Sequence, residues 1–187
     1  MAFLVLGVIT GQLMARALVV IDVLTGIFEL PIPLHEPATF AERVAGLLAR
    51  ARQAHALIVH VRQLGDPGTR FAPDAPTRQF HTSAMPLADE LVIEKRHPDA
   101  FQNTTLADVL RACGARSVAI VGFATEFCVD ASVRSGYAHG FEIALASDAH
   151  TTTAGLVLPA ADAIAHHNFV LERFARVRPA ADIVFEA

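Results

Sequence analysis

Val118-Ala-Ile-Val-Gly-Phe-Ala-Thr-Glu-Phe-Cys128 is an apolar run, a glycine and a short turn that ends in a cysteine. The run Val118–Val121 is typical of a buried strand that ends at Gly122, and Glu126–Gly140 is predicted to be a helix. A thiol in the first turn of a helix faces unpaired N–H groups and the positive end of the helix dipole, which lower its pKa. We therefore expect Cys128 to be a reactive thiolate. The alternative is a small buried hydrophobic residue, the usual role of a free cysteine.

Strand-like and helix-like segments alternate on both sides of this stretch. Such alternation predicts an α/β fold with three layers, in which helices cover both faces of a mostly parallel sheet. The predicted strands are Ala17–Val23, Leu57–Val61, Leu91–Glu94, Val118–Val121, Glu142–Ala146 and, as a candidate sixth strand, Phe169–Leu171. The predicted helices are Pro37–Gln53, Leu106–Cys113, Glu126–Gly140 and Leu156–His166. The segment Gly65–Pro86 is predicted to be a long loop, and loops of that length are more often functional than idle.

Composition narrows the class of protein. The chain has 187 residues, 53% of them hydrophobic, a length that fits one domain with a substantial core. A net charge of -4, a pI of about 6.1 and scattered basic residues give no reason to expect a nucleic-acid partner. Two cysteines, Cys113 and Cys128, form no disulfide framework, so we expect a reducing, cytoplasmic location.

The first fifteen residues carry no charge. The apolar stretch Ala2–Leu13 is too short to span a bilayer, which takes about 20 residues. Ala15-Arg16-Ala17 resembles a signal cleavage site, but no basic region precedes it, and cleavage there would cut into the first strand. We therefore expect residues 1–13 to be an apolar extension ahead of a single domain at 14–187, with no membrane partner.

Three reactive side chains follow predicted strands. Asp22 lies in the first strand segment near its end, Lys95 follows the third strand and Cys128 follows the fourth. Ligands of open parallel sheets bind beyond the carboxyl ends of the strands, so these side chains can meet at one edge. There the carboxylate would take the thiol proton and the ammonium would stabilise the ion cluster. Asp22→Asn should then slow alkylation of Cys128. Taken singly, Asp22 is equally consistent with a turn cap and Lys95 with a solvated strand end.

Four stretches around these residues resemble the isochorismatase-like cysteine hydrolases. They are Ala17-Leu-Val-Val-Ile-Asp22 with Phe28, Val92-Ile-Glu-Lys95-Arg, Phe101-Gln-Asn-Thr-Thr-Leu106 and Gly122-Phe-Ala-Thr-Glu-Phe-Cys128-Val. The resemblance runs in order from about residue 17 to about residue 153. It implies a six-stranded parallel sheet that carries Cys128 as nucleophile, Asp22 as proton acceptor and donor, and Lys95 as the cation beside them.

The resemblance also implies a reaction. A non-proline cis peptide bond would join Phe123 to Ala124, and the N–H groups of Ala124 and Cys128 would form an oxyanion hole. The substrate would be a small amide, lactam or ureido compound, cleaved at its C–N bond through a thioester without a cofactor. Nicotinamidases of this family hold a metal with an Asp-x-His motif, and no such motif occurs between Asp22 and Lys95. We therefore expect no catalytic metal, and similarity to N-carbamoylsarcosine amidohydrolase or streptothricin hydrolase instead.

Four further residues are candidates for the substrate pocket: Phe28, His60, His97 and Phe101. The two phenylalanines are equally consistent with the core, and each histidine with a hydrogen-bonded structural role. The family often has glutamine where this chain has Leu24, so a polar contact to substrate is missing here. Substrate choice is expected to depend on the Gly65–Pro86 loop and on a neighbouring subunit of a homo-oligomer.

Three functions are consistent with the sequence. The first is a metal-independent cysteine amidohydrolase acting on a small molecule, the reading that the presence of Cys128 favours. The second is an isochorismatase-type or other hydrolase on the same scaffold, since fold alone does not set chemistry. The third is a binding or assembly subunit without catalytic activity.

Overall fold

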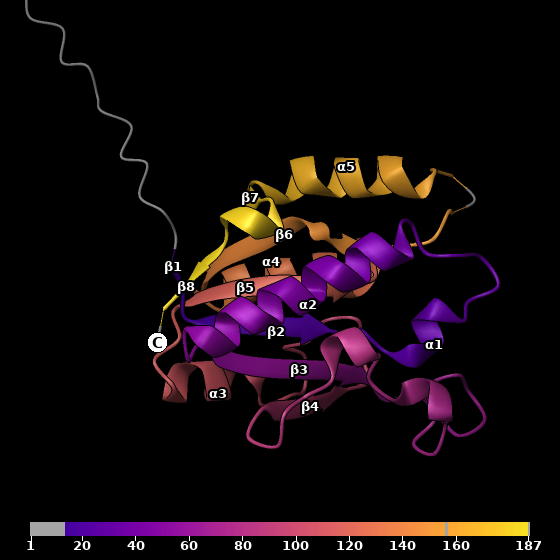
Figure 1. Cartoon of the computed structure of the whole chain (residues 1–187), viewed down its shortest axis with the longest axis horizontal. Coiled ribbons are helices and arrows are strands. Elements are labelled where there is room, and N and C mark those ends of the chain that lie inside the picture. The colour runs from indigo at the N-terminus through magenta and orange to yellow at the C-terminus, as the bar shows by residue number, and fades with distance from the viewer. Residues whose placement is uncertain (1–13, 156, 187) are drawn as a thin grey trace, which may run out of the picture.

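Six strands form one fully parallel sheet in the computed structural model, which describes residues 14–155 and 157–186. Their order across the sheet is β4-β3-β2-β5-β6-β7 (Figure 1). The strands are β2 (Ala17–Ile21), β3 (Leu57–Gln63), β4 (Leu91–Lys95), β5 (Ser117–Phe123), β6 (Glu142–Thr151) and β7 (Ala175–Arg178). A separate parallel pair joins β1 (Met14–Ala15) to β8 (Val184–Phe185). The α/β class and parallel sheet predicted from the sequence are confirmed, whereas the expected extension at 1–13 lies outside the described residues.

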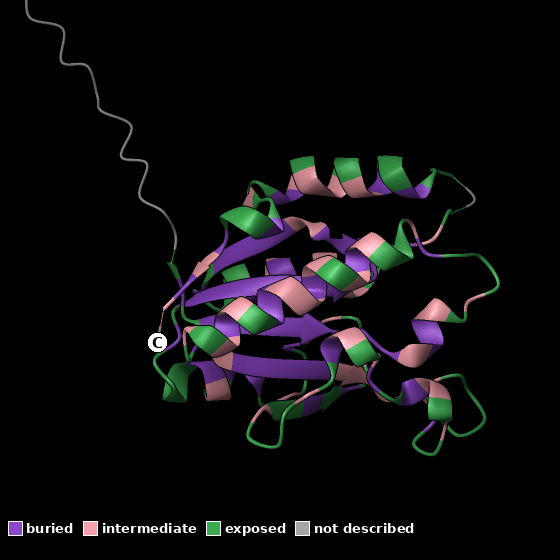
Figure 2. Ribbon diagram, in the orientation of Figure 1, coloured by how far each residue is buried: buried purple, intermediate pink, exposed green. Residues whose placement is uncertain are grey.

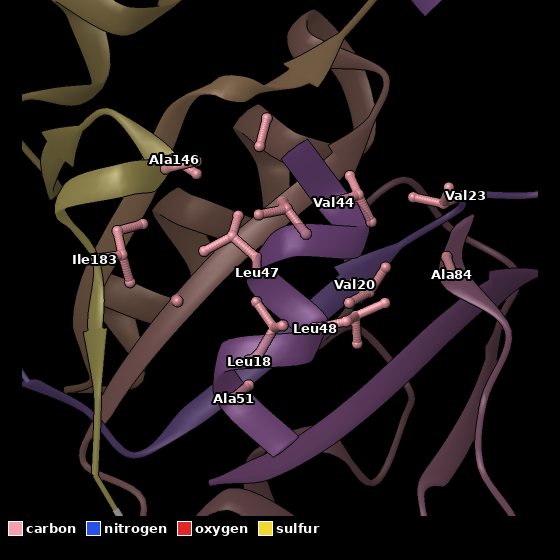
Figure 3. Packing of buried hydrophobic residues seen from close by; sticks show 14 of the residues in the cluster. Leu18, Val20, Val23, Val44, Leu47, Leu48, Ala51, Ala84, Ala146 and Ile183 are labelled. Atoms are coloured by element: carbon pink, nitrogen blue, oxygen red, sulfur yellow. The ribbon is translucent and has the colours of Figure 1, made fainter. Parts of the chain in front are cut away.

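Helices lie on both faces of the sheet: α1 (Thr25–Phe28), α2 (Pro37–Gln53), α3 (Leu106–Ala112), α4 (Asp130–Ala138) and α5 (Ala160–Leu171). Figure 1 shows α2 crossing one face. Because alternate side chains of a strand point to opposite faces, Leu18 and Val20 of β2 pack beneath α2, while Val19 and Ile21 join the core on the other side. Figure 3 shows Leu47 and Leu48 of α2 in the first of these clusters.

The second cluster takes its helical residues from α3, α4 and the end of α5. The central strands are therefore buried on both faces, which is why they are continuous apolar runs in the sequence (Figure 2). None of the helices in the described parts of the chain is long and apolar enough to cross a membrane.

The predicted sixth strand at Phe169–Leu171 is wrong. These residues end α5, and the edge strand is β7 at Ala175–Arg178. A three-residue apolar run is compatible with either structure. The real strand was missed because its residues alternate between half-buried and exposed, as Ala-Arg-Val-Arg, and lack an apolar run.

The segment between β3 and β4 is the long loop that the sequence predicts. It contains two short 3-10 turns, Pro76–Arg78 and Thr82–Ala84. Arg78 is buried, and its Nε donates to the carbonyl of Gln63 at 3.0 Å. The same guanidinium pairs with Glu94. One loop residue thus connects the ends of β3 and β4, the two strands that the loop joins.

Candidate active site

Asp22 leaves β2 in a left-handed conformation with φ +53°. Asp accepts this conformation more readily than most residues because its short polar side chain forms local hydrogen bonds. The Asp22 N–H donates to the carbonyl of Val61 at 2.8 Å, which holds the turn against β3. The Asp22 side chain is 4% exposed and lies at the carboxyl end of the sheet.

Gly122 brings the end of β5 against the end of β2. It has φ +134°, and a Cβ at this position would lie 2.0 Å from the carbonyl oxygen of Ile21. One residue further on, the peptide bond between Phe123 and Ala124 is cis, at the junction where the resemblance implies one. The chain then forms a π-helical turn, η3 (Thr125–Val129), and continues into α4. Cys128 lies in this turn, half-buried.

Lys95 is in contact with both other residues. Its Nζ lies 2.7 Å from Asp22 Oδ2 and 3.3 Å from Cys128 Sγ. The Lys95 side chain is fully buried, so the ion pair is shielded from water. The structure therefore brings together the carboxylate, the ammonium and the sulfur that the sequence placed after three separate strands.

The ionisation of this group follows from burial and from the neighbouring charges. Burial raises the pKa of Asp22 above its ordinary value, and Lys95 offsets this only in part. Burial also disfavours the Lys95 ammonium. The negative charge of Asp22, and that of the Cys128 sulfur once it ionises, outweigh burial and raise the Lys95 pKa. The pair is thus an ion pair whose carboxylate is a stronger base than an exposed aspartate.

The expected lowering of the Cys128 pKa is wrong. Burial, and then the charge of Asp22, raise the pKa of this thiol to about 11, while Lys95 lowers it only in part. The helix-dipole argument failed because it ignored the carboxylate beside the sulfur and the loss of water around it. At neutral pH the sulfur therefore carries a proton, with a carboxylate beside it that can accept this proton.

A buried chain of hydrogen bonds supports the cysteine turn, and sequence reasoning missed it. The Thr125 hydroxyl lies 2.8 Å from His150 Nδ1, and His150 Nε2 lies 2.9 Å from Asn168 Oδ1. Burial lowers the pKa of His150 to about 4, so the ring is neutral. Asn168 Nδ2 donates to the carbonyl of Ser147, which leaves Oδ1 to accept from the ring. His150 Nδ1 therefore accepts a hydrogen bond from Thr125, the first residue of η3.

The two candidate pocket phenylalanines pack against other rings. Phe101 is 5% exposed and stacks on Phe141 in the core and on the exposed His139, with centroid distances of 5.9 and 5.3 Å. This favours the core alternative for Phe101. Phe28 ends α1 and stacks on His81 with ring centroids 3.9 Å apart. Phe28 is only partly buried, so both alternatives stay open for it.

The two candidate histidines have different surroundings. His60 is fully buried in β3, where its Nε2 lies 2.8 Å from Glu90 Oε2, and burial lowers its pKa. This arrangement favours a structural histidine. His97 is half-buried in the bend after β4, and no hydrogen bond or ring contact within 14–155 and 157–186 involves it. In those same ranges no three His, Cys, Asp or Glu residues gather as they would around a metal ion.

The chain is similar in sequence and in fold to proteins of one family. Residues 16–182 match the isochorismatase domain. A streptothricin hydrolase from Streptomyces noursei is 38% identical over 137 residues, 73% of this chain and 50% of that protein. A maleamate amidohydrolase from Pseudomonas putida is 34% identical over 142 residues, 67% of each chain. An isochorismatase crystal structure from Pseudomonas putida KT2440 has a TM-score of 0.85 at 34% identity and covers 90% of both chains.

The chain spans about half the length of the streptothricin hydrolase that it matches. The domain match nevertheless covers most of the chain, and the solved structure agrees with it in fold across nine tenths of its length. The chain belongs to the isochorismatase-like hydrolase family.

Proposed function

We propose that the protein is a cysteine hydrolase that cleaves the C–N bond of a small amide, lactam or ureido compound through a thioester. The observation that carries this proposal is the contact of one buried ammonium, that of Lys95, with both the Asp22 carboxylate and the Cys128 sulfur. Two relatives named streptothricin hydrolase and maleamate amidohydrolase support it, the second by a name that denotes amide cleavage.

The first half of the reaction uses the base beside the thiol. Asp22 takes the proton of Cys128 as the sulfur attacks the substrate carbonyl, and the Lys95 ammonium stabilises the negative charge that moves onto the sulfur. The tetrahedral oxyanion is held by the backbone N–H groups of Ala124 and Cys128. Protonated Asp22 then gives its proton to the leaving nitrogen, which departs as ammonia or an amine.

The second half of the reaction returns the enzyme to its starting state. Water attacks the thioester on Cys128, and Asp22 accepts a proton from this water. The carboxylic acid product leaves, and the sulfur recovers its proton. A carboxylate with a raised pKa suits this double role, because it must bind and release the same proton in each turnover.

A screen of small amides, lactams and ureido compounds for release of ammonia or amine tests the proposal. We expect Cys128→Ala to lose turnover by roughly a thousandfold or more, as removal of a nucleophile does in other covalent hydrolases. Cys113→Ala is the matched control, because Cys113 is exposed and should be dispensable. Turnover of an amide by folded Cys128→Ala would contradict the proposal. Cleavage of isochorismate without cleavage of any amide would favour the isochorismatase-type alternative.

A further inference from the structure

Lys95 and Asp22 are in contact although their strands are not neighbours in the sheet. Lys95 ends β4 and Asp22 follows β2, and β3 lies between these two strands. Neighbouring strands are about 4.8 Å apart, so the Lys95 and Asp22 side chains together span about two such spacings. The residue in register with Lys95 on the intervening strand is Gln63. The lysine therefore passes over the end of β3, where Gln63 lies.

Gln63 is as close to the ammonium as the carboxylate is. Lys95 Nζ donates to Gln63 Oε1 at 2.7 Å, the same distance as to Asp22 Oδ2, and to Cys128 Sγ at 3.3 Å. A lysine ammonium has three N–H donors and no acceptor. These three neighbours match its three donors. Since the side chain is fully buried, loss of one acceptor would leave a donor unsatisfied in the interior.

We propose that Gln63 is a positioning residue whose amide oxygen holds the Lys95 ammonium between the Asp22 carboxylate and the Cys128 sulfur. The acceptor is neutral, which fits the location. A carboxylate there would add a second negative charge beside a sulfur that must itself become negative during attack. Gln63 thus directs the lysine without opposing the thiolate. Its importance for turnover rests on the cysteine-hydrolase function proposed above, whereas its effect on the sulfur does not depend on any substrate.

The backbone of Gln63 is itself fixed. Its carbonyl accepts a hydrogen bond from the buried Arg78 at 3.0 Å, and Arg78 also pairs with Glu94, the residue before Lys95. The guanidinium of Arg78, from the long loop, therefore holds the main chain at Gln63 and the side chain of the residue before Lys95. A residue that positions the ammonium needs a backbone that is fixed in this way.

The test measures alkylation of Cys128 by iodoacetamide as a function of pH, in a Cys113→Ser background that removes the exposed thiol. In Gln63→Met the acceptor is lost and the shape is nearly kept. We expect about tenfold slower alkylation at pH 9, equivalent to an upward shift of about one unit in the thiol pKa. Gln53→Met, at an exposed position on α2, is the matched control and should alkylate like the parent.

Gln63→Asn is a second variant, whose amide is one methylene too short to reach the lysine and should also slow alkylation. Circular dichroism checks that each variant is folded. If either folded variant is alkylated as fast as the parent protein at each pH, the inference is wrong. Slow alkylation in both, with no amide cleaved by the parent protein, would support Gln63 and contradict the proposed function. Amide cleavage that depends on Cys128, together with normal alkylation of Gln63→Met, would support the proposed function and contradict the role of Gln63.

Discussion

The reactivity of Cys128 depends on the charges around its sulfur and on its burial. Burial and the Asp22 carboxylate raise the pKa of Cys128, and Lys95 lowers it only in part. A thiol with a pKa of about 11 is almost entirely protonated at pH 7. In the proposed mechanism the nucleophile therefore forms as Asp22 takes the thiol proton during attack. The same carboxylate, together with burial, then keeps the resting thiol unreactive.

Asp22→Asn should separate these two roles. Removing the carboxylate removes a charge that opposes the thiolate and leaves the Lys95 ammonium beside the sulfur, so the thiol pKa should fall. Alkylation of Cys128 by iodoacetamide at pH 7 should then become at least about tenfold faster. This is the opposite of the slowing that the sequence predicts. Hydrolysis should be lost in the same variant, because nothing remains to protonate the leaving nitrogen.

Asp108→Asn is the control for this experiment, since Asp108 is 86% exposed on α3, away from the long loop. It should change neither the alkylation rate nor hydrolysis. Slower alkylation of Asp22→Asn would instead mean that the carboxylate activates the resting thiol, and the assigned direction of the Cys128 pKa would be wrong.

The sequence was sufficient to find Asp22, Lys95 and Cys128 because each closely follows, or ends, an apolar run, and parallel strands bring such positions to one edge. It was insufficient for Gln63 and His150. Gln63 lies 32 residues from Lys95 and ends β3 as an ordinary polar residue. The role of His150 depends on partners 25 and 18 residues away, and on a neutral ring that only burial explains. Neither residue belongs to a recognisable local motif.

Among the elements, the close approach of β5 to β2 determines where the cysteine turn lies. In Gly122→Ala the new methyl group would overlap the carbonyl of Ile21, and the residue would hold a φ that side chains rarely adopt. We expect a loss of about 3 kcal/mol or more in the free energy of unfolding, measured by urea titration. Hydrolysis should fall with it, because Cys128 and Asp22 follow these two strands.

Gly46→Ala is the matched control for Gly122→Ala. Gly46 is inside α2, and the nearest atom to its added methyl group, at 3.8 Å, is the end of a flexible arginine. This change should stabilise the protein by about 0.5–1 kcal/mol, because alanine favours a helix over glycine. Equal and small effects of the two substitutions would show that β5 and β2 can separate without cost.

Element boundaries were the part of the fold that the sequence described least well. The strand predicted at Glu142–Ala146 continues to Thr151, and its pairing with β5 shifts register between Ile120 and Gly122. Polar residues such as Ser147 and Asp148 interrupt the apolar pattern there. An irregular strand of this kind has no simple period, so its end depends on pairing with β5, which periodicity alone cannot show.

In the whole molecule, the order in which the chain adds strands to the sheet explains why the site lies at the carboxyl ends of β2 and β5. The chain adds β3 and then β4 on one side of β2, and returns to place β5 on the other side. The order reverses between β2 and β5, and ligands of open α/β sheets bind beyond the strand ends at such a point. Asp22 and Cys128 flank this reversal, while Gln63 and Lys95 are the last residues of the next two strands, β3 and β4. Four adjacent strands therefore each contribute one side chain.

The stability of this assembly should depend on pH through Glu90, which connects the α2 layer to the β3–β4 side of the sheet. Burial alone would raise the Glu90 pKa, but hydrogen bonds from Arg52, the Leu87 N–H and His60 lower it from 4.5 to about 2. Because the folded pKa is lowered, the stabilisation is complete above pH 4.5 and is lost as the pH falls toward 2. We expect Glu90→Gln to cost about 2 kcal/mol at pH 7.

Urea unfolding of the parent and of Glu90→Gln from pH 7 to pH 3 measures this contribution. The difference in unfolding free energy should narrow as the pH falls below 4.5, because the parent then loses the charge that the variant never had. Glu42→Gln is the control, since Glu42 is an exposed residue on the same helix as Arg52 and should leave the profile unchanged. A constant difference at all pH values would mean that Glu90 stabilises the fold by its shape and neutral hydrogen bonds, and that its charge contributes nothing.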